Sequence, residues 1–441
     1  MTATNSGVPA MPGAASAGRR HSSHIAPGEI AIGVVIGRAS ENFDFFVYGI
    51  ASALIFPSIF FPFLSQLEGT LASFAIFSFA FIARPFGTLA FMAIQRRWGR
   101  EAKLTVALFM LGSSTAGIAF VAPYSTLGMG AILLLAVFRI GQGIALGGSW
   151  DGLPSLLALS APERRRGWYA ALGQLGAPVG FAIAAGLFAF LYSSLTPADL
   201  FEWGWRYPFY CAFAINVVAL FSRLRLLSSP EYAELLDERD LQPSGAGQIV
   251  SKQGGVLLIG AFAALASFAL FHIVTIFPLS WINLFSHQTI SEFLVVQIIG
   301  AGLGAVGIVA SGLIADRWGR KRTLGALAVL IALFALFAEP LLNGGTSGQD
   351  AFILIGFALL GLSYGQSAGV VSARFEPQNR YTGAALTTDL SWLMGAAFAP
   401  LVALGLSSYF GTLAVTGYLL SGCIATLVAL RVNRTLAARQ S

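Results

Sequence analysis

The most unusual chemistry in this sequence lies in a polar passage inside an apolar stretch near the start of the chain. Residues 37–49 read Gly-Arg-Ala-Ser-Glu-Asn-Phe-Asp-Phe-Phe-Val-Tyr-Gly. At about 100° per residue, Glu41, Asp44 and Tyr48 share one face of a helix. A carboxylate in such surroundings costs several kcal/mol unless it faces a cavity or a partner. We therefore expect Asp44 to be functional, and Glu41 either to pair with Arg38 or to act with Asp44.

Arginine and amide side chains are the natural partners of these acids. Arg84 lies about 18 Å along a helix from the basic turn at Arg96, too far for its side chain to reach that turn. Its charge is expected to be neutralised inside the protein, by Asp44 or by a bound anion. Arg139 and Gln142, spaced three apart, are expected to point into the same interior together.

Two further aspartates lie within apolar stretches. Asp389 stands about 13 Å along a helix from the basic residue Arg380 and is expected to be functional. Asp151 lies nearer a polar turn, where it either caps a helix or carries a proton. His272 is expected to be a packed, hydrogen-bonded histidine. The remaining candidates for ligand contact are Tyr48, Gln174, Tyr364, Gln366 and Trp392.

Catalytic and metal chemistry find little support in the sequence. It contains no Ser-His-Asp order, phosphate-binding loop or metal-ligand cluster, and only four histidines and two cysteines. His21 and His24 have a metal-like spacing but lie in a polar tail. Cys211 and Cys423 fall in apolar runs and are expected to be small core residues. We predict neither an enzyme nor a bound cofactor or metal.

The composition predicts an integral membrane protein. Of the 441 residues, 56% are hydrophobic and 10% are charged, and the mean hydropathy is +0.75. Such a chain has too few polar side chains to cover a soluble particle. Apolar runs of about 20 residues are typical of membrane-spanning helices, which satisfy their own backbone hydrogen bonds.

Twelve spans are predicted, and the positions of the basic residues define their topology. The Lys and Arg outside these spans all fall on one side, whereas Arg38, Arg84, Arg139 and Arg206 lie within or at the edge of a span. Because positive loops stay inside, both chain ends are expected in the cytoplasm, and the basic charge reflects topology rather than nucleic-acid binding. The predicted spans are 29–57, 68–92, 104–122, 126–158, 168–192, 206–226, 254–285, 291–314, 324–338, 351–372, 381–406 and 413–430.

The spans divide into two sets of six. A short amphipathic helix is expected to begin at Pro230, in the acidic segment between the two sets. The predicted parts are a disordered cytoplasmic tail (1–28), a first six-helix bundle (29–226), a cytoplasmic linker (227–253), a second six-helix bundle (254–431) and a second tail (432–441).

Two short basic turns relate the halves to each other. Arg-Trp-Gly-Arg occurs at 97–100 and again at 317–320, each time between two apolar runs. The loop at 373–383 likewise resembles the loop at 161–167. This repetition predicts an all-α integral membrane fold of twelve transmembrane helices in two pseudo-symmetric bundles.

These motifs resemble those of a known family. Residues 312–321, Gly-Leu-Ile-Ala-Asp-Arg-Trp-Gly-Arg-Lys, are similar to the signature loop of the major facilitator superfamily. The resemblance implies two bundles that rock about a central cavity and take up a small polar solute together with protons. More narrowly, the segments that resemble the metabolite:proton symporter family are 41–49, 84–87, 139–143, 203–209 and 380–383.

The resemblance also suggests roles for single residues. Asp44 is similar to the family's carboxylate in the first helix, and Arg84 and Arg139 are similar to its buried arginines. The second signature loop resembles the one that locks the outward-facing state. The residues of the two conformational loops are Arg97, Gly99, Arg100, Asp316, Arg317, Gly319 and Arg320.

The sequence departs from the family at five positions. Gln95 and Arg96 replace the expected Gly and Asp of the first signature loop, so its charge latch is either missing or rebuilt. Ser149 stands where the family usually carries Glu, and Asp151 is a candidate replacement. Ala93 replaces a common histidine. Asp389 has no expected counterpart.

Taken together, the sequence predicts a secondary active transporter of the inner membrane that works by alternating access. The expected reaction is proton-coupled uptake of a small organic solute, most simply a carboxylate. Asp44, assisted by Glu41, Asp151 or Asp389, is the expected proton carrier, and the partners are solute, protons and lipid. Burial raises the pKa of a carboxyl and a nearby arginine lowers it, which makes such an exchange feasible. We expect a monomer.

Two alternatives remain open at this stage. The first is proton-driven efflux, or uptake of a cationic or zwitterionic solute on Asp44 and Asp389, which the two acids and the aromatic cavity candidates favour. The second is a non-transporting receptor or regulator on a transporter fold, favoured only by the altered first loop. Solute uptake into proteoliposomes distinguishes these classes.

Overall fold

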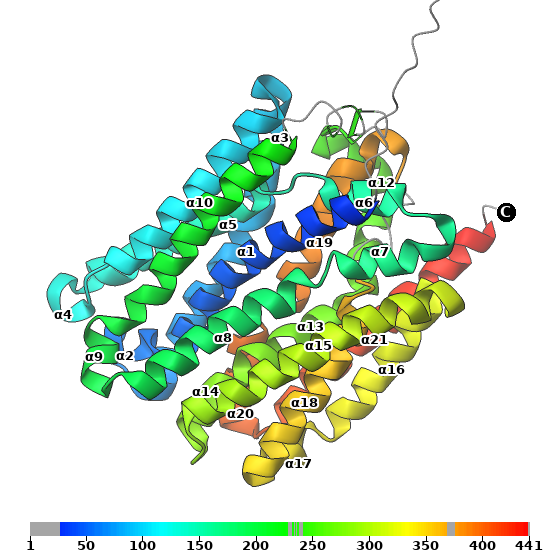
Figure 1. Cartoon of the computed structure of the whole chain (residues 1–441). Coiled ribbons are helices and arrows are strands. Elements are labelled where there is room, and N and C mark those ends of the chain that lie inside the picture. The colour runs from blue at the N-terminus through cyan, green and yellow to red at the C-terminus, as the bar shows by residue number, and fades with distance from the viewer. Residues whose placement is uncertain are drawn as a thin grey trace, which may run out of the picture.

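The computed structural model describes residues 27–439 except 228–231, 233, 235, 238–240 and 368–374. These described residues form helices and connecting turns without a β-strand, as predicted (Figure 1). The first half contains α1 (Pro27–Leu54), α2 (Phe56–Phe60), α3 (Gln66–Phe120), α4 (Tyr124–Leu127), α5 (Met129–Gly148), α6 (Leu153–Ser160), α7 (Arg166–Leu172), α8 (Gly176–Ser194), α9 (Pro197–Glu202) and α10 (Tyr207–Leu227). The second half contains α12 (Ala246–Ala263), α13 (Leu265–Thr275), α14 (Phe277–Phe285), α15 (Ile290–Trp318), α16 (Arg320–Leu336), α17 (Ala338–Leu342), α18 (Gly345–Tyr364), α19 (Arg380–Gly395), α20 (Ala399–Phe410) and α21 (Leu413–Arg439).

Twelve membrane crossings are built from these helices, several of which are interrupted. Within the described residues, 9 helical segments are long and apolar enough to span a membrane. One of them, α3, holds two crossings, because the backbone turns at Gly99. The polar helix α1 and the interrupted pair α16–α17 supply the remaining two crossings.

Glycine makes both Arg-Trp-Gly-Arg turns possible. Gly99 has φ 87° and Gly319 has φ 83°, in the left-handed region that residues with a Cβ rarely adopt. Each glycine lets an outgoing helix end and the next one start without a long loop. The repeated motif is therefore a repeated backbone geometry, with its basic residues at one end of the molecule, which we call the basic end.

Small residues allow α3 and α5 to cross in close contact. A Cβ added at Gly87 would lie 2.2 Å from the carbonyl oxygen of Ile144. Cβ atoms added at Gly143 and Gly147 would lie 2.3 Å from carbonyl oxygens of α3. Gly143 and Gly147, spaced four residues apart, therefore form a close-packing face of α5. Such contact makes the α3–α5 pair a firm unit inside the first bundle.

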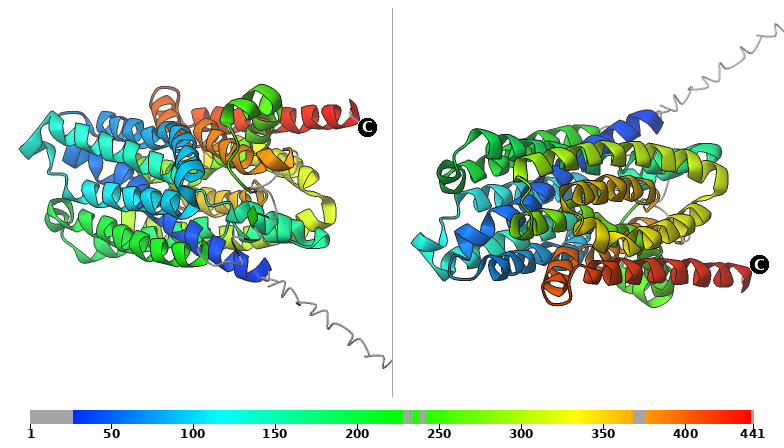
Figure 2. Two further views of the ribbon diagram at one scale, coloured as in Figure 1. Left: turned by 90° about the horizontal axis from the view of Figure 1, so that it is seen from above. Right: turned by 90° about the horizontal axis from the view of Figure 1, so that it is seen from below.

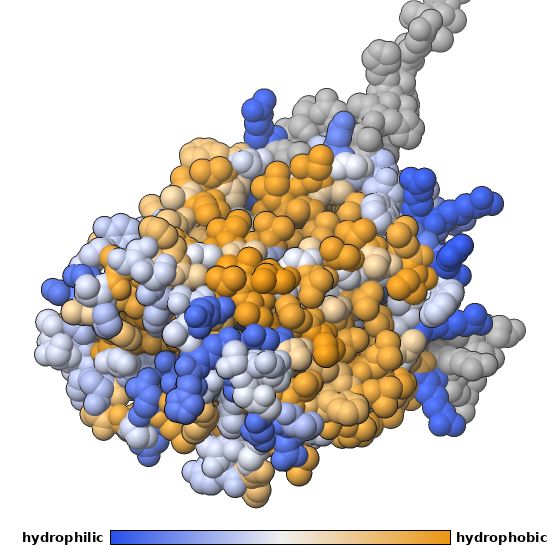
Figure 3. Space-filling model, turned by 60° about the horizontal axis from the view of Figure 1, so that its bottom comes forward, coloured by the Kyte–Doolittle hydropathy of each residue, from blue (hydrophilic) through white to orange (hydrophobic). Residues whose placement is uncertain are grey.

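The outer surface of the molecule is apolar around its middle. Figure 3 shows a broad hydrophobic area with hydrophilic residues gathered at its margins. Large apolar side chains such as Phe109, Phe120, Phe190 and Val306 are exposed on it. In water these side chains would be unfavourable, but in a bilayer they face lipid.

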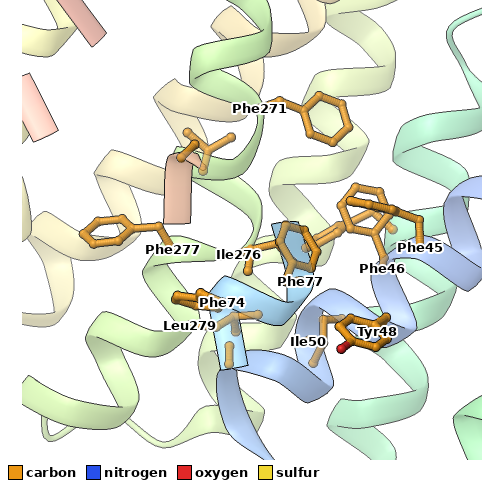
Figure 4. Packing of buried hydrophobic residues seen from close by; sticks show 14 of the residues in the cluster. Phe45, Phe46, Tyr48, Ile50, Phe74, Phe77, Phe271, Ile276, Phe277 and Leu279 are labelled. Atoms are coloured by element: carbon orange, nitrogen blue, oxygen red, sulfur yellow. The ribbon is translucent and has the colours of Figure 1, made fainter. Parts of the chain in front are cut away.

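The two halves of the chain form two bundles that meet along a long boundary. In Figures 1 and 2 the helices of the first half gather on one side and α15 to α18 on the other. Across the boundary α8 and α7 contact α15, and α3 contacts α19. Figure 4 shows aromatic side chains of both halves within one core, where Phe46 stacks on Phe271 with ring centroids 5.7 Å apart.

Some predicted details of the elements need correction. Cys423 is buried as predicted, but Cys211 is exposed on α10, where the apolar surface faces lipid. The last helix continues to Arg439 and so includes most of the segment predicted as the second tail (432–441). The start of the predicted linker helix at Pro230 lies outside the described residues. The helix is interrupted shortly before Pro178, since α7 ends at Leu172 and α8 begins at Gly176.

Candidate functional site

A cavity of about 470 Å³ lies where the two bundles meet. We call it the central cavity. Its polar side is formed by Arg38, Glu41 and Asn42 of α1 and Arg84 of α3. Its aromatic side is formed by residues of both halves, namely Phe45, Phe81, Tyr364 and Trp392. A cavity of mixed character at the boundary between repeats is where this kind of fold binds its solutes.

A buried ion pair joins the two bundles beside the central cavity. Arg84 Nε donates to Asp389 Oδ1 at 2.7 Å, and Thr88 Oγ1 donates to Asp389 Oδ2 at 2.5 Å. Asp389 is buried on α19, whereas Arg84 and Thr88 lie on α3. The sequence predicted that either Asp44 or a bound anion would neutralise Arg84. For Asp44 this prediction is wrong, because Arg84 pairs with Asp389 instead. The partner is an acid from the other half of the chain.

Asp44 belongs to a separate network inside the first bundle. Its carboxylate accepts hydrogen bonds from Thr115 at 2.7 Å, from Gln142 at 3.0 Å and from Asn216 at 2.5 Å. Gln142 in turn accepts from Arg139 Nη1 at 3.0 Å, so the expected pairing of these two residues is confirmed. Asp44 is buried and does not line the central cavity.

Arg139 is held mainly by aromatic rings. Its guanidinium carbon lies 3.9 Å from the ring centroid of Tyr48 and 4.8 Å from that of Phe77. Nε donates to the Phe77 carbonyl oxygen at 3.2 Å. Cation–π contact of this kind stabilises a buried guanidinium without a direct carboxylate. Tyr48, Arg139 and Gln142 were predicted to contact ligand, but here they lie behind the cavity wall.

A second ion-pair cluster lies on the basic side of the central cavity. Arg223 of α10 donates to Glu41 at 2.6 Å, to Asp151 at 2.6 Å and to the Ser149 carbonyl oxygen at 2.6 Å. Glu41 also pairs with Arg38 at 3.4 Å, as predicted. Asp151 Oδ1 accepts from the backbone N–H of Leu153, which bears out its capping role.

This cluster borders a second cavity of about 320 Å³, which we call the basic-side cavity. Arg38, Glu41, Arg84 and Leu146 line both it and the central cavity. Polar groups therefore follow one another from the boundary of the bundles towards the basic end. The sequence analysis counted Arg223, near the end of the predicted span 206–226, among the basic residues outside the membrane, but its side chain is 7% exposed.

A third cavity of about 300 Å³ is almost entirely apolar, and we call it the apolar cavity. Phe46 and Phe181 line it from the first half, and Phe271, Phe357 and Tyr364 line it from the second. Tyr364 is also a wall of the central cavity. The two cavities thus meet at one tyrosine side chain.

His272 lies within the aromatic cluster between the bundles. Its ring stacks on Phe45 with centroids 5.3 Å apart, and its Nδ1 lies 3.2 Å from Thr275 Oγ1. The prediction of a packed, hydrogen-bonded histidine is confirmed. The His272 ring contacts three aromatic residues that line the central cavity, namely Phe45, Phe81 and Trp392. These residues separate His272 from the cavity.

One contact between the bundles at the basic end uses the second signature loop. Asp316 accepts from the backbone N–H groups of Gly167 at 2.7 Å and Trp168 at 3.2 Å, at the start of α7. A carboxylate at a helix N-terminus is favoured by its free N–H groups and its dipole. Arg320 Nε donates to Gln366 at 3.3 Å, and Gln366 donates to the Gly167 carbonyl oxygen at 3.3 Å. Gln366, predicted to contact ligand, here belongs to this contact.

The residues that flank the first signature loop make a corresponding contact with the other bundle, and this contact uses hydrogen bonds instead of an ion pair. Tyr381 of α19 donates to Gln95 at 2.9 Å, and Lys103 donates to the Tyr381 hydroxyl at 2.8 Å. Lys103 and Tyr381 also bond the Trp150 carbonyl oxygen. The sequence placed Lys103 in an exposed loop, but it is 2% exposed. The first latch is therefore rebuilt around Tyr381 rather than missing.

The other predicted loop residues have modest roles in this conformation. Arg97 lies over the ring of Trp98 at 5.0 Å, and Arg100 approaches Asp237 at 3.8 Å. Arg317 is exposed. Gln174, predicted to contact ligand, is half-buried in the break between α7 and α8 and is not a wall of the three cavities described above.

The bundles also touch on the far side of the central cavity. Ser78 Oγ donates to the Ala397 carbonyl oxygen at 2.8 Å. A Cβ added at Gly49 would lie 2.6 Å from Cδ1 of Ile276 in the other bundle. Together with Phe46 on Phe271, these contacts join the bundles on the side of the cavity away from the basic end. The bundles are thus in contact on both sides of the central cavity.

Comparison with known proteins agrees with the geometry. The model of the Major Facilitator Superfamily matches residues 43–400. The inner membrane metabolite transport protein YhjE of Escherichia coli is 36% identical over 411 residues, covering 91% of this chain and 93% of that protein. The shikimate transporter of Escherichia coli is 30% identical over 409 residues, covering 89% and 91%. The proline/betaine transporter of Escherichia coli is 27% identical, covering 81% and 74%.

Solved structures support the same architecture. A structure of the proton:xylose symporter XylE superimposes with a TM-score of 0.69 at 18% identity, covering 91% of this chain and 94% of that one. At this identity the likeness concerns the fold, twelve helices in two bundles. The chain therefore belongs to the Major Facilitator Superfamily and is a multi-pass membrane transporter rather than an enzyme.

Proposed function

We propose that this protein takes up a small carboxylate together with a proton, and that the Arg84–Asp389 pair couples the two. The observation that supports this most is the pair itself, a buried cation and anion from opposite bundles beside the central cavity. Neither charge is stable there alone, since a buried charge without a partner costs several kcal/mol. Any event that removes one partner must supply a substitute.

A proton and a carboxylate supply that substitute together. When Asp389 is protonated, it no longer neutralises Arg84, and the carboxylate of a solute takes its place. When the solute leaves, Arg84 recovers Asp389 only if the proton also leaves. One proton is thus moved with each carboxylate. Glu41 and Asp151, which border the basic-side cavity and both pair with Arg223, are the next carboxyl groups along the proton's way.

We infer the orientation of the protein in the membrane from the positions of its basic residues. Basic loops are retained in the cytoplasm, so the basic end and both termini face the cell interior in this proposal. The membrane is the inner membrane, as the name of the relative YhjE indicates for that protein. Asp44 remains a secondary candidate for proton coupling, since it accepts three hydrogen bonds and reaches Arg139 through Gln142.

Uptake into proteoliposomes tests this proposal. A panel of carboxylates, amino acids, betaines and aromatic acids is offered with an inward proton gradient and after its collapse. We expect a carboxylate to accumulate only with the gradient. Arg84→Gln is expected to lower carboxylate affinity at least tenfold, and Arg225→Gln, at an exposed arginine of α10, leaves it unchanged.

Asp389→Asn separates binding from coupling. The amide imitates a protonated carboxyl, so this variant is expected to exchange labelled for unlabelled solute across the membrane. It is not expected to accumulate solute in response to a proton gradient. Undiminished carboxylate affinity in Arg84→Gln, or gradient-driven accumulation by Asp389→Asn, would contradict the assignment.

A second candidate is proton-coupled uptake of a zwitterionic solute. The observation that favours it is Glu41, an acid on the polar side of the central cavity opposite aromatic rings that attract cations. The proline/betaine transporter is a relative whose name points in the same direction. In the same uptake panel, a betaine or amino acid that accumulates while simple carboxylates do not would favour this candidate.

A further inference from the structure

The central cavity presents more hydrogen-bond donors than its own acceptors use. Arg84 bonds Asp389 through Nε alone, and no hydrogen bond from either Nη is found within the described residues. Since Arg84 lines the cavity, these N–H groups form a fork that suits the two oxygens of one carboxylate. This fork is one end of a binding site.

The aromatic side of the cavity carries two more unpaired groups. Trp392 and Tyr364 are each 7% exposed and line the cavity, yet neither the indole N–H nor the phenol O–H has a hydrogen-bond partner among the described residues. Neither of these two atoms is fully enclosed by protein, so a bound solute could reach each of them. An acceptor oxygen on a bound solute would satisfy either of them.

Aromatic rings line much of the same cavity. Trp392 stacks on Phe81 with centroids 5.9 Å apart and a 24° interplanar angle, and it contacts Phe268 edge-on at 5.0 Å. Tyr364 contacts Phe271 at 5.1 Å, and beyond it lies the apolar cavity. Aromatic walls of this kind favour a flat or ring-shaped apolar body.

The charges around the two polar cavities are balanced. Arg38, Arg84 and Arg223 face Glu41, Asp151 and Asp389, and each of these six side chains is paired with at least one of the others. One carboxylate that arrives with one proton keeps this balance. A second carboxylate on the same solute would enter the cavity without a free cation, at a cost of several kcal/mol.

We infer that the solute is a monocarboxylate on a ring-sized, largely apolar body that carries at least one hydroxyl or carbonyl oxygen. This inference rests on the proposed function and narrows it. Arg84 holds the carboxylate, the ring lies against the aromatic wall formed by Phe45, Phe81 and Trp392, and the Trp392 N–H or the Tyr364 O–H donates a hydrogen bond to the second oxygen. Dicarboxylates and acids of two or three carbons fit the site poorly.

Ligand-dependent thermal stabilisation of the purified full-length protein tests the inference, because a ligand that binds the folded state raises its melting temperature. The probes are 3-hydroxybenzoate, 4-hydroxybenzoate and 3-hydroxycyclohexanecarboxylate, with benzoate lacking the second oxygen, isophthalate adding a second carboxylate and lactate lacking the ring. We expect at least one hydroxylated ring acid to bind about tenfold more tightly than benzoate, isophthalate and lactate.

Two conservative variants identify the groups responsible. Trp392→Phe and Tyr364→Phe keep a ring in place and remove one donor each. At least one of them is expected to reduce the preference for the hydroxylated acid over benzoate to about twofold, because only the hydroxylated acid loses a hydrogen bond. Trp392→Leu is expected to weaken both ring acids.

The binding results distinguish failure of this inference from failure of the proposed function. If carboxylates bind in a way that Arg84→Gln abolishes, but isophthalate or lactate binds as well as the hydroxylated ring acids, this inference is overturned and the proposed function stands. The same holds if neither Phe variant changes the preference. If none of the carboxylate probes binds in an Arg84-dependent way, both are overturned.

Discussion

At the scale of single residues, Arg223 makes three charges depend on one another. One guanidinium holds Glu41 and Asp151, and all three side chains are buried. Removal of either acid leaves the arginine with one carboxylate partner. Removal of the arginine leaves two carboxylates close together with less positive charge to neutralise them. The cluster is therefore far more sensitive to loss of its cation than to loss of one anion.

We predict that Arg223→Met lowers the free energy of unfolding by about 3–5 kcal/mol, measured as chemical or thermal unfolding in detergent. Adding Glu41→Gln and Asp151→Asn to that variant should restore most of the loss, because no unpaired charge remains. Arg225→Met, at an exposed position on the same helix, is the control. An unchanged stability of Arg223→Met would show that water reaches the cluster freely.

At the scale of elements, the α3–α5 crossing fixes where Arg84 and Arg139 stand. Both arginines lie on these two helices, and the glycines of the crossing bring the helix backbones into direct contact. A shift of one helix against the other would therefore move Arg84 relative to Asp389. Packing at the glycines controls the geometry of the ion pair between bundles.

Gly143→Ala is predicted to cost about 1–3 kcal/mol of stability, since its Cβ would lie 2.3 Å from the Ala80 carbonyl oxygen. Gly302→Ala, at a helical glycine of α15 with nothing within 4 Å, should be neutral or slightly stabilising. Thermal unfolding of the two variants side by side is the measurement. Equal effects at both positions would mean that the crossing tolerates a wider separation.

At the scale of the whole molecule, two latches of different chemistry hold the basic end closed. One is a carboxylate on backbone N–H groups, through Asp316, and the other joins Tyr381 to Gln95 and Lys103. Both must break before the bundles can separate at this end. Each intramolecular hydrogen bond contributes about 0.5–1.5 kcal/mol, so the loss of one residue is enough to change the balance of conformations.

Tyr381→Phe is accordingly predicted to increase the population of molecules that are open at the basic end about tenfold. This corresponds to a change of roughly 1.4 kcal/mol in the free-energy difference between the closed and open conformations. Spin labels at positions 98 and 318, where the native tryptophans are 61% and 62% exposed, report the distance between the two turns. The protein used for labelling has both native cysteines, Cys211 and Cys423, replaced. Tyr409→Phe, at a residue that is 83% exposed, is the matched control, and an unchanged distance distribution in Tyr381→Phe would refute the latch.

The sequence predicts the architecture well because its signals are local. Apolar length, basic turns and the Gly143–Gly147 spacing each arise within one segment, and so does the Arg38–Glu41 pair. The Arg84–Asp389 pair could not be predicted, because its partners lie on α3 and α19 and periodicity does not say which helices become neighbours. Lys103 and Arg223 were misplaced for a related reason. Basic residues near span ends are usually exposed, and only the tertiary fold shows that these two are enclosed.

The equal number of positive and negative side chains around the cavities has an energetic consequence for the living cell. If one proton enters with one carboxylate, the loaded and empty carriers have the same net charge, and transport moves no current. The electrical part of the proton-motive force then does no work on the solute. Uptake would depend on the difference in pH alone, so a cell in alkaline surroundings would lose this route even with its membrane voltage intact.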